Sequence, residues 1–167
     1  IILVDAEAAP IKPNESTPVA ASRLSAISLD GAHVFDRIIE ADPAPDAYLT
    51  ALMGLDDHAF TTAAANEEVV AAFHAFCEAR QREGPVALVS WEVWTRGWLQ
   101  RNVDPTPCVL LKGVWANISK GRVPALEKVV SSLGLTPIID RVPGRSGRRL
   151  GMAAAMAHTI LHPSPDA

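Results

Sequence analysis

Two carboxylates end the apolar run at the start of the chain, Ile1 to Ala8, where Asp5 and Glu7 are separated by a single residue. Alternate side chains of an extended strand point to the same side, so both acids should lie on one face, about 7 Å apart along the backbone. Oxygen ligands held in this way suit Mg²⁺ or Mn²⁺, because a cation removes the repulsion between the two charges. A strand whose polar end simply reaches solvent would give the same pattern. The pair is therefore a candidate metal site that the rest of the chain must support.

A second group of charged residues lies near the C-terminus, where the sequence reads Arg145-Ser146-Gly147-Arg148-Arg149. Guanidinium groups bind phosphate and carboxylate oxygens through paired hydrogen bonds. Arg145, Arg148 and Arg149 are therefore candidates for contacts with nucleic acid, or for ion pairs with the two acids of the first strand. Solvated arginines at the start of a helix are the alternative interpretation.

Length and composition indicate one globular domain over residues 1–167, with 49% hydrophobic and 20% charged residues. The formal net charge of −4 excludes an overall basic character, so any binding of nucleic acid would have to be local. No apolar stretch reaches the ~18 residues of a membrane span. The first apolar run has no basic segment before it and does not resemble a secretion signal, so we expect a cytoplasmic protein without membrane contact.

The elements that must position these residues follow from local patterns. Asp30-Gly31 between two alternating segments predicts a hairpin over 22–40. One helical face should carry the three tryptophans Trp91, Trp94 and Trp98, because of their spacing. Such a face is typical of a helix packed in the core, and a surface on which bases stack is the alternative interpretation. The other predicted elements are a strand at 1–8, a short helix at 46–53 capped by Asp46, a helix starting at a capping Asn66 and ending before Gly84, a strand at 85–90, a helix at 91–100, a strand at 108–111, a helix at 123–134, and a last helix at 150–161 after an arginine-rich loop.

Four segments in this order resemble the motifs of the DEDD superfamily of 3′–5′ exonucleases. They are Val4-Asp5-Ala6-Glu7-Ala8, the stretch from Met53 to Phe60, the stretch from Leu88 to Leu99, and the helix from Val123 to Leu135 that contains Leu133-Gly134. The resemblance covers nearly the whole chain. It implies an α/β, RNase H-like fold, in which a central mixed sheet of three antiparallel strands followed by parallel strands is flanked by helices.

The same resemblance implies a function. This sequence, however, departs from the family's motifs at two places. In that family four carboxylates hold two divalent metals, Mg²⁺ or Mn²⁺, at the 3′ end of a nucleic acid strand, and a histidine or tyrosine acts as general base. The aspartate of the second motif falls on Thr95, and the nearby acid, Glu92, is three residues away from that position. No acid lies between Asp140 and Asp166, and His158 is about two turns beyond the place expected for the base.

Three hypotheses follow. The first is a degenerate, catalytically weak or inactive exonuclease-like domain that binds single-stranded nucleic acid or a protein partner, with Asp5 and Glu7 as the remnant of the active site. The second is an active metal-dependent exonuclease whose missing ligands come from Glu92 or Asp140. The third is a protein-interaction domain with only architectural similarity, which associates through its tryptophans.

Overall fold

A computed structural model describes residues 1–9, 20–56, 58–103, 107–137 and 141–163. The strands are β1 (Ile2–Ala8), β2 (Ala21–Ser28), β3 (Val34–Ile38), β4 (Leu88–Ser90) and β5 (Cys108–Leu110). The helices are α1 (Ala47–Leu52), the 3₁₀ helix η1 (Ala59–Thr62), α2 (Asn66–Gln81), α3 (Val93–Asn102), α4 (Leu111–Ser119), α5 (Leu126–Ser132) and α6 (Gly144–Leu161). In this part of the chain no helix is long and apolar enough to cross a membrane.

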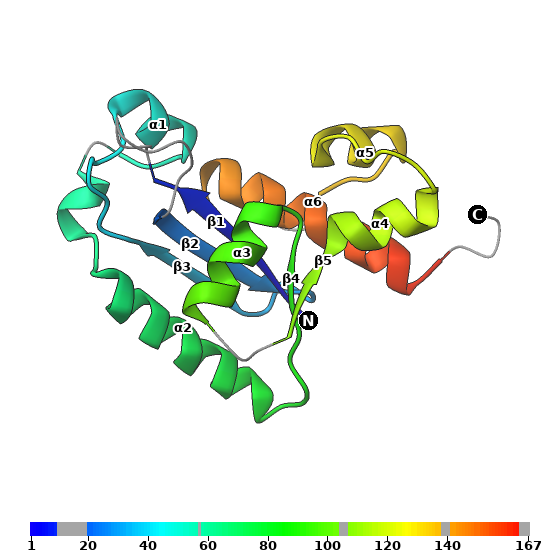
Figure 1. Cartoon of the computed structure of the whole chain (residues 1–167), viewed down its shortest axis with the longest axis horizontal. Helices are drawn as coiled ribbons and strands as arrows, with labels where there is room; N and C mark the ends of the chain where they lie inside the picture. Colours follow the sequence, from blue (N-terminus) through cyan, green and yellow to red (C-terminus); the bar gives the residue numbers. More distant parts are fainter. Residues whose placement is uncertain (10–19, 57, 104–106, 138–140, 164–167) are drawn as a thin grey trace.

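The five strands form one mixed sheet in the order β3-β2-β1-β4-β5, with β1 at its centre. The pairs β1–β2 and β2–β3 are antiparallel, whereas β1–β4 and β4–β5 are parallel. Helices cover both faces of the sheet, with α3 crossing one face and α6 crossing the other (Figure 1). This is the architecture that the sequence predicts, because the hairpin keeps three strands antiparallel and helical crossovers deliver the last two.

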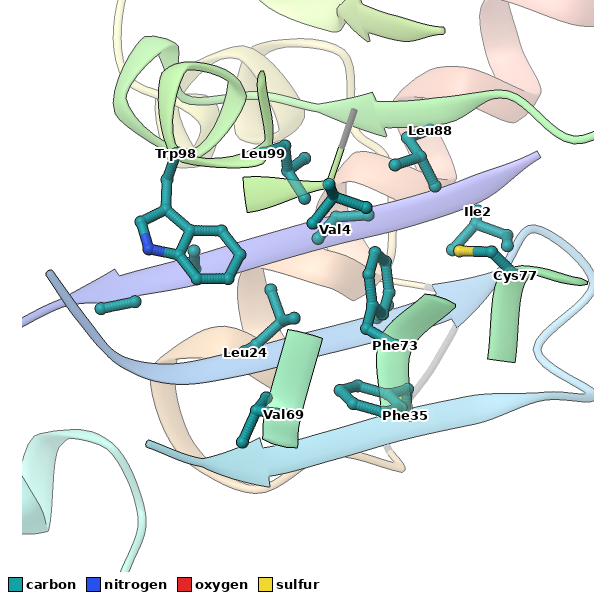
Figure 2. Close-up of a cluster of buried hydrophobic side chains, with 14 of the residues drawn as sticks. Ile2, Val4, Leu24, Phe35, Val69, Phe73, Cys77, Leu88, Trp98 and Leu99 are labelled. Atoms are coloured by element: carbon teal, nitrogen blue, oxygen red, sulfur yellow. The ribbon is translucent and has the colours of Figure 1, made fainter. Parts of the chain in front are cut away.

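Strand β1 has different partners on its two sides because its residues alternate. Ile2 and Val4 pack in a core with Phe73 of α2 and Trp98 of α3, and this core is drawn in Figure 2. Leu3 belongs to a second core on the opposite face, which is built mainly by α5 and α6. Asp5 and Glu7 share the parity of Leu3. The sheet therefore presents its two acids to the side that α6 covers.

Most of the predicted elements are confirmed. The strand at 1–8, the hairpin with Gly31 at a φ of 73°, the helix over 66–81 and the two later strands are all present. Asp46 caps α1, since its Oδ1 accepts a hydrogen bond of 2.8 Å from the backbone N–H of Leu49. The predicted loop over residues 10–18 and the candidate ligand Asp140 lie outside the described residues.

Three predictions about these elements are wrong. Asn66 is the first residue of α2 rather than its cap, a position that Ala65 occupies. Trp91 precedes α3 and is buried in the α5–α6 core, whereas Trp98 lies in the α2–α3 core, so the tryptophans do not form one stripe. The arginines from Arg145 to Arg149 are on the first turns of α6 rather than in a loop before it, because that helix begins at Gly144.

Candidate functional site

The site lies where the C-terminal end of β1 meets the first turns of α6. Both acids of β1 are buried, with Asp5 exposing 5% and Glu7 1% of its surface. Both contact side chains of α6, which confirms that they lie on one face of the strand. Burial of two carboxylates requires compensating donors or cations, because an unpaired buried charge is strongly destabilising.

Helix α6 supplies these partners itself. Ser146 Oγ donates a hydrogen bond of 2.7 Å to Asp5 Oδ2, and Arg149 Nη1 lies 3.7 Å from Asp5 Oδ1. Arg145 Nε lies 3.4 Å from Glu7 Oε1. The two arginines are four residues apart and therefore share one face of the helix. The positive end of the helix dipole adds to their charge, since both are in its first turns.

Helix α3 closes the other side of the site. The hydroxyl of Thr95 meets the backbone of β1 midway between the two acids, 3.3 Å from the N–H and 3.5 Å from the carbonyl oxygen of Ala6. Glu92 is the N-cap residue of the same helix, and its Oε1 lies 4.0 Å from Arg149 Nη2. A cleft of about 320 Å³ opens here, lined by Ala6, Ala8, Glu92, Trp94, Thr95, Arg145 and Arg149.

A fully buried arginine on β2 fixes the start of α6 over this cleft. Arg23 donates hydrogen bonds to Asp36 on β3 at 2.8 Å, to the carbonyl oxygen of Met53 at 2.6 Å and to that of Pro143 at 3.2 Å. Met53 ends α1 and Pro143 precedes α6, so one guanidinium ties both helices to the sheet. We call this the Arg23 junction.

Two glycines allow the backbones at the junction to approach. Gly54 and Gly144 both have positive φ, 71° and 72°. A Cβ atom on Gly144 would lie 2.0 Å from the carbonyl oxygen of Met53, and one on Gly54 would lie 2.6 Å from Gly144 Cα. Any other residue at either position would push α6 away from the sheet.

The donor set of the site fits guanidinium groups better than a pair of divalent cations. Three of the four carboxylate oxygens of Asp5 and Glu7 already face Ser146, Arg149 or Arg145. The fourth, Glu7 Oε2, is buried without a hydrogen-bond partner. In the described part of the chain, no three histidine, cysteine or acidic side chains are grouped so that they could hold a metal ion. The residues present therefore do not fit a two-metal centre.

Burial dominates the electrostatics of Asp5. It raises the pKa of the Asp5 carboxyl above its ordinary value, although Arg149 and the hydrogen bond from Ser146 oppose this shift. Repulsion from Glu7 raises the pKa further, and Arg145 lowers it. A carboxyl with a raised pKa in the folded state favours folding while it is protonated, and this contribution is lost as the pH rises through the folded-state pKa.

The Asp5→Asn variant should therefore gain stability relative to the wild type as the pH rises from 4 to 7. Asparagine keeps the shape of the side chain and can accept the Ser146 hydrogen bond, but it carries no charge to desolvate. The check is the free energy of unfolding of both proteins in urea at the two pH values. A difference that stays constant with pH, or that shrinks toward pH 7, would contradict the raised pKa. Asp46→Asn, at an exposed cap, is the control.

The remaining predicted residues lie elsewhere. Arg148 is exposed, and no ion pair joins it to either acid within the described residues. His158 is exposed further along α6 and lines a different cavity of about 470 Å³ with His33. Ser146 and Arg23 were missed. The signal for Arg23 was a charged residue within an otherwise small and apolar strand, but its partners come from three distant segments.

The sheet order, its parallel and antiparallel pairs and the covering helices define the class: the chain has the RNase H-like fold of the DEDD-type 3′-exonucleases. A full-length 3′-exonuclease superposes with a TM-score of 0.72 and 14% identity, over 96% of this chain and 80% of that chain. A 3′-exonuclease in 3′-end specific recognition of a histone mRNA stem-loop gives 0.71 and 15%, with the same coverage.

A third solved structure, exonuclease X in complex with 5′ overhanging duplex DNA, gives a TM-score of 0.62 and 8% identity, over 98% of this chain and 93% of that chain. At such identities the likeness establishes the fold. No protein-family model matches the sequence, and no curated protein matches it.

Proposed function

We propose that this chain is an exonuclease-fold domain that binds nucleic acid without metal-dependent cleavage. The observation that carries the proposal is that two guanidinium groups of α6 face the two acids of β1. Arg149 lies 3.7 Å from Asp5 and Arg145 lies 3.4 Å from Glu7, where a hydrolytic site of this fold would need cations.

Charge explains why both arrangements cannot coexist. A two-metal site concentrates about four positive charges and needs carboxylates to balance them. The site has three carboxylates, those of Asp5, Glu7 and Glu92, and two of their negative charges are already offset by Arg145 and Arg149. A divalent cation would have to displace these guanidinium groups or tolerate their repulsion.

Nucleic acid is the partner that the fold favours. Of the solved structures that superpose on this chain, one shows recognition of a histone mRNA stem-loop and another is a complex with 5′ overhanging duplex DNA. A protein partner has less support, because Trp91 and Trp98 expose only 5% and 1% of their surface and Trp94 is partly buried.

The direct test uses labelled single-stranded DNA and RNA with Mg²⁺ or Mn²⁺, and measures binding and shortening in the same samples. We expect binding that persists in EDTA and no shortening of the strand. Asp5→Ala is the control for contaminating nuclease, since shortening that survives this change does not come from the site. Robust shortening that disappears in Asp5→Ala would overturn the proposal.

Restoring carboxylates should restore metal binding. The Thr95→Asp, Arg149→Asp double variant places acids on both sides of Asp5 and removes the guanidinium that competes with a cation. Residues that only orient metal ligands change metal affinity by about 10–100-fold when mutated, so replacing the ligands themselves should tighten Mn²⁺ binding by at least about tenfold. Isothermal titration with Mn²⁺ measures the effect. Arg148→Asp is the matched control, because this exposed arginine contacts neither acid, and it should leave Mn²⁺ binding unchanged.

An active exonuclease is the second candidate, and two observations favour it. Glu92 lines the same cleft as the two arginines, and Glu7 Oε2 is buried without a partner, which leaves one carboxylate oxygen open. In that case wild-type protein should bind Mn²⁺ with an affinity that Glu92→Gln weakens. If neither the wild type nor Glu92→Gln binds Mn²⁺ at millimolar concentration, this candidate is excluded.

A further inference from the structure

The charges of this chain are divided unevenly along its sequence. Residues 1–111 contain seven lysines and arginines and sixteen acids, a net charge of −9, whereas residues 112–167 contain eight lysines and arginines and three acids, a net charge of +5. The overall value of −4 therefore hides two regions of opposite sign. Such asymmetry is typical of proteins that bind a polyanion through one part of their surface.

The fold separates some of the helices on either side of this division. In the view of Figure 1, α1 and α2 lie toward the left of the molecule and α4 and α5 lie toward the right. The first turn of α2 contains Glu67 and Glu68, which are exposed. Over α4, α5 and the turns beside them, residues 111–137 contain four basic residues, Lys112, Lys120, Arg122 and Lys128, and one acid, Glu127. We call these four residues the basic tip.

Most of the basic tip is open to solvent. Lys120, Arg122 and Lys128 are exposed, and Lys112 is half-buried. Lys120 ends α4 in the left-handed conformation, with a φ of 52°, and the chain then turns directly into α5. That turn gathers three exposed cations within nine residues of sequence. In the described part of the chain, the ion pairs involve other residues, so no carboxylate lies within ion-pair distance of the basic tip.

The cleft at β1 lacks these properties. Its lining carries one acid, Glu92, and two guanidinium groups, and Arg145 and Arg149 already face the buried carboxylates of Glu7 and Asp5 beside it. A phosphate entering the cleft would meet guanidinium charges that Glu7, Asp5 and Glu92 already offset. A strand that this protein binds therefore needs its attractive contacts outside the cleft.

We infer that the basic tip is the surface that holds the phosphodiester backbone of a nucleic acid. The inference rests on the proposed function and deepens it, since it assigns binding to a surface away from the remnant active site. Contacts of this kind are electrostatic, so they depend steeply on salt and little on base sequence. The tip should therefore bind internal stretches of a strand as well as its ends.

The test uses a fluorescein-labelled single-stranded oligonucleotide of mixed sequence, in EDTA, with binding followed by anisotropy across a range of salt concentrations. The variant is Arg122→Gln, Lys128→Gln. Each phosphate contact on a single strand contributes about 0.7 to the slope of log affinity against log salt, so removing two should flatten it by about 1.4. Over a tenfold rise in salt, the variant should therefore lose about 25-fold less affinity than the wild type loses. Thermal unfolding checks that the variant is folded.

The matched control is Arg82→Gln, Arg101→Gln, which removes the same charge from exposed positions at the ends of α2 and α3. We expect it to keep the wild-type slope. If both variants flatten the salt slope equally, or if neither does, the assignment of binding to the basic tip is overturned, whereas the proposed binding of nucleic acid still stands. No oligonucleotide binding by the wild type would overturn the proposed function as well. If the wild type binds phosphatidylserine vesicles in place of the oligonucleotide, and the tip variant does not, the basic tip is a lipid-binding surface and the inference is overturned.

Discussion

Replacing Arg23 by methionine should lower the free energy of unfolding by about 2–4 kcal/mol. Arg23 is fully buried and donates hydrogen bonds to Asp36 and to the carbonyl oxygens of Met53 and Pro143. Methionine fills similar volume but donates nothing, so the two carbonyl groups and Asp36 lose their partner. Breaking a buried ion pair costs about 3–5 kcal/mol, and the lower range here reflects the partial exposure of Asp36 and its remaining bond from Ser25.

Urea unfolding measures this loss, and Arg82→Met is the control. Arg82 is exposed, and substitutions of this kind usually change stability by less than about 0.5 kcal/mol. A loss of less than about 1 kcal/mol in Arg23→Met would show that the junction contributes little to the fold. Because the junction anchors the start of α6, the variant should also weaken the contacts that hold Asp5 and Glu7, and the pH dependence of its stability should change with them.

The Gly147→Ala substitution should destabilise the protein by about 2 kcal/mol although alanine favours helices. A Cβ atom at this position would lie 1.6 Å from the carbonyl oxygen of Val142, which is impossible without a shift of the backbone. Overpacking of this kind costs about 1–3 kcal/mol or more, and the gain in helix propensity of about 1 kcal/mol offsets only part of it. The shift would also move Ser146, the neighbour that bonds to Asp5.

The control for this prediction is the same substitution in another helix. At Gly113 in α4 the nearest atom to an added Cβ is Leu110 Cδ2, at 3.8 Å, an ordinary contact. Gly113→Ala should therefore leave stability unchanged or raise it by up to about 1 kcal/mol. If thermal and urea unfolding give both alanine variants the same stability, close packing at Gly147 is not what holds α6 in place.

Local patterns were sufficient for the elements whose neighbours in space are also neighbours in sequence. The hairpin around Asp30-Gly31 and the cap at Asp46 depend on residues within a few positions of each other, and both are present. The tryptophans show where this fails. Trp91 and Trp98 are seven residues apart, but the chain turns between β4 and α3, so the two indoles enter cores on opposite faces of the sheet.

The start of α6 shows the same limit in another way. Gly144, Ser146 and Gly147 favour a loop by their intrinsic preferences, which is why the arginine-rich segment did not resemble a helix. In the fold, the glycines are needed because α6 passes so close to Met53 and Val142 that no Cβ fits. Tertiary packing therefore overrides the local preference, and it places Arg145 and Arg149 on one helical face.

The sequence by itself determined the central strand with its two acids on one face, the order of elements and the resemblance to an exonuclease fold, because alternation and turn chemistry are local. Only the tertiary structure decided what faces those acids. Their partners come from a distant part of the sequence. Ser146 is 141 positions from Asp5, and Arg145 is 138 positions from Glu7. A buried carboxylate must be offset by whichever charge the fold brings nearest, and here the fold brings guanidinium groups.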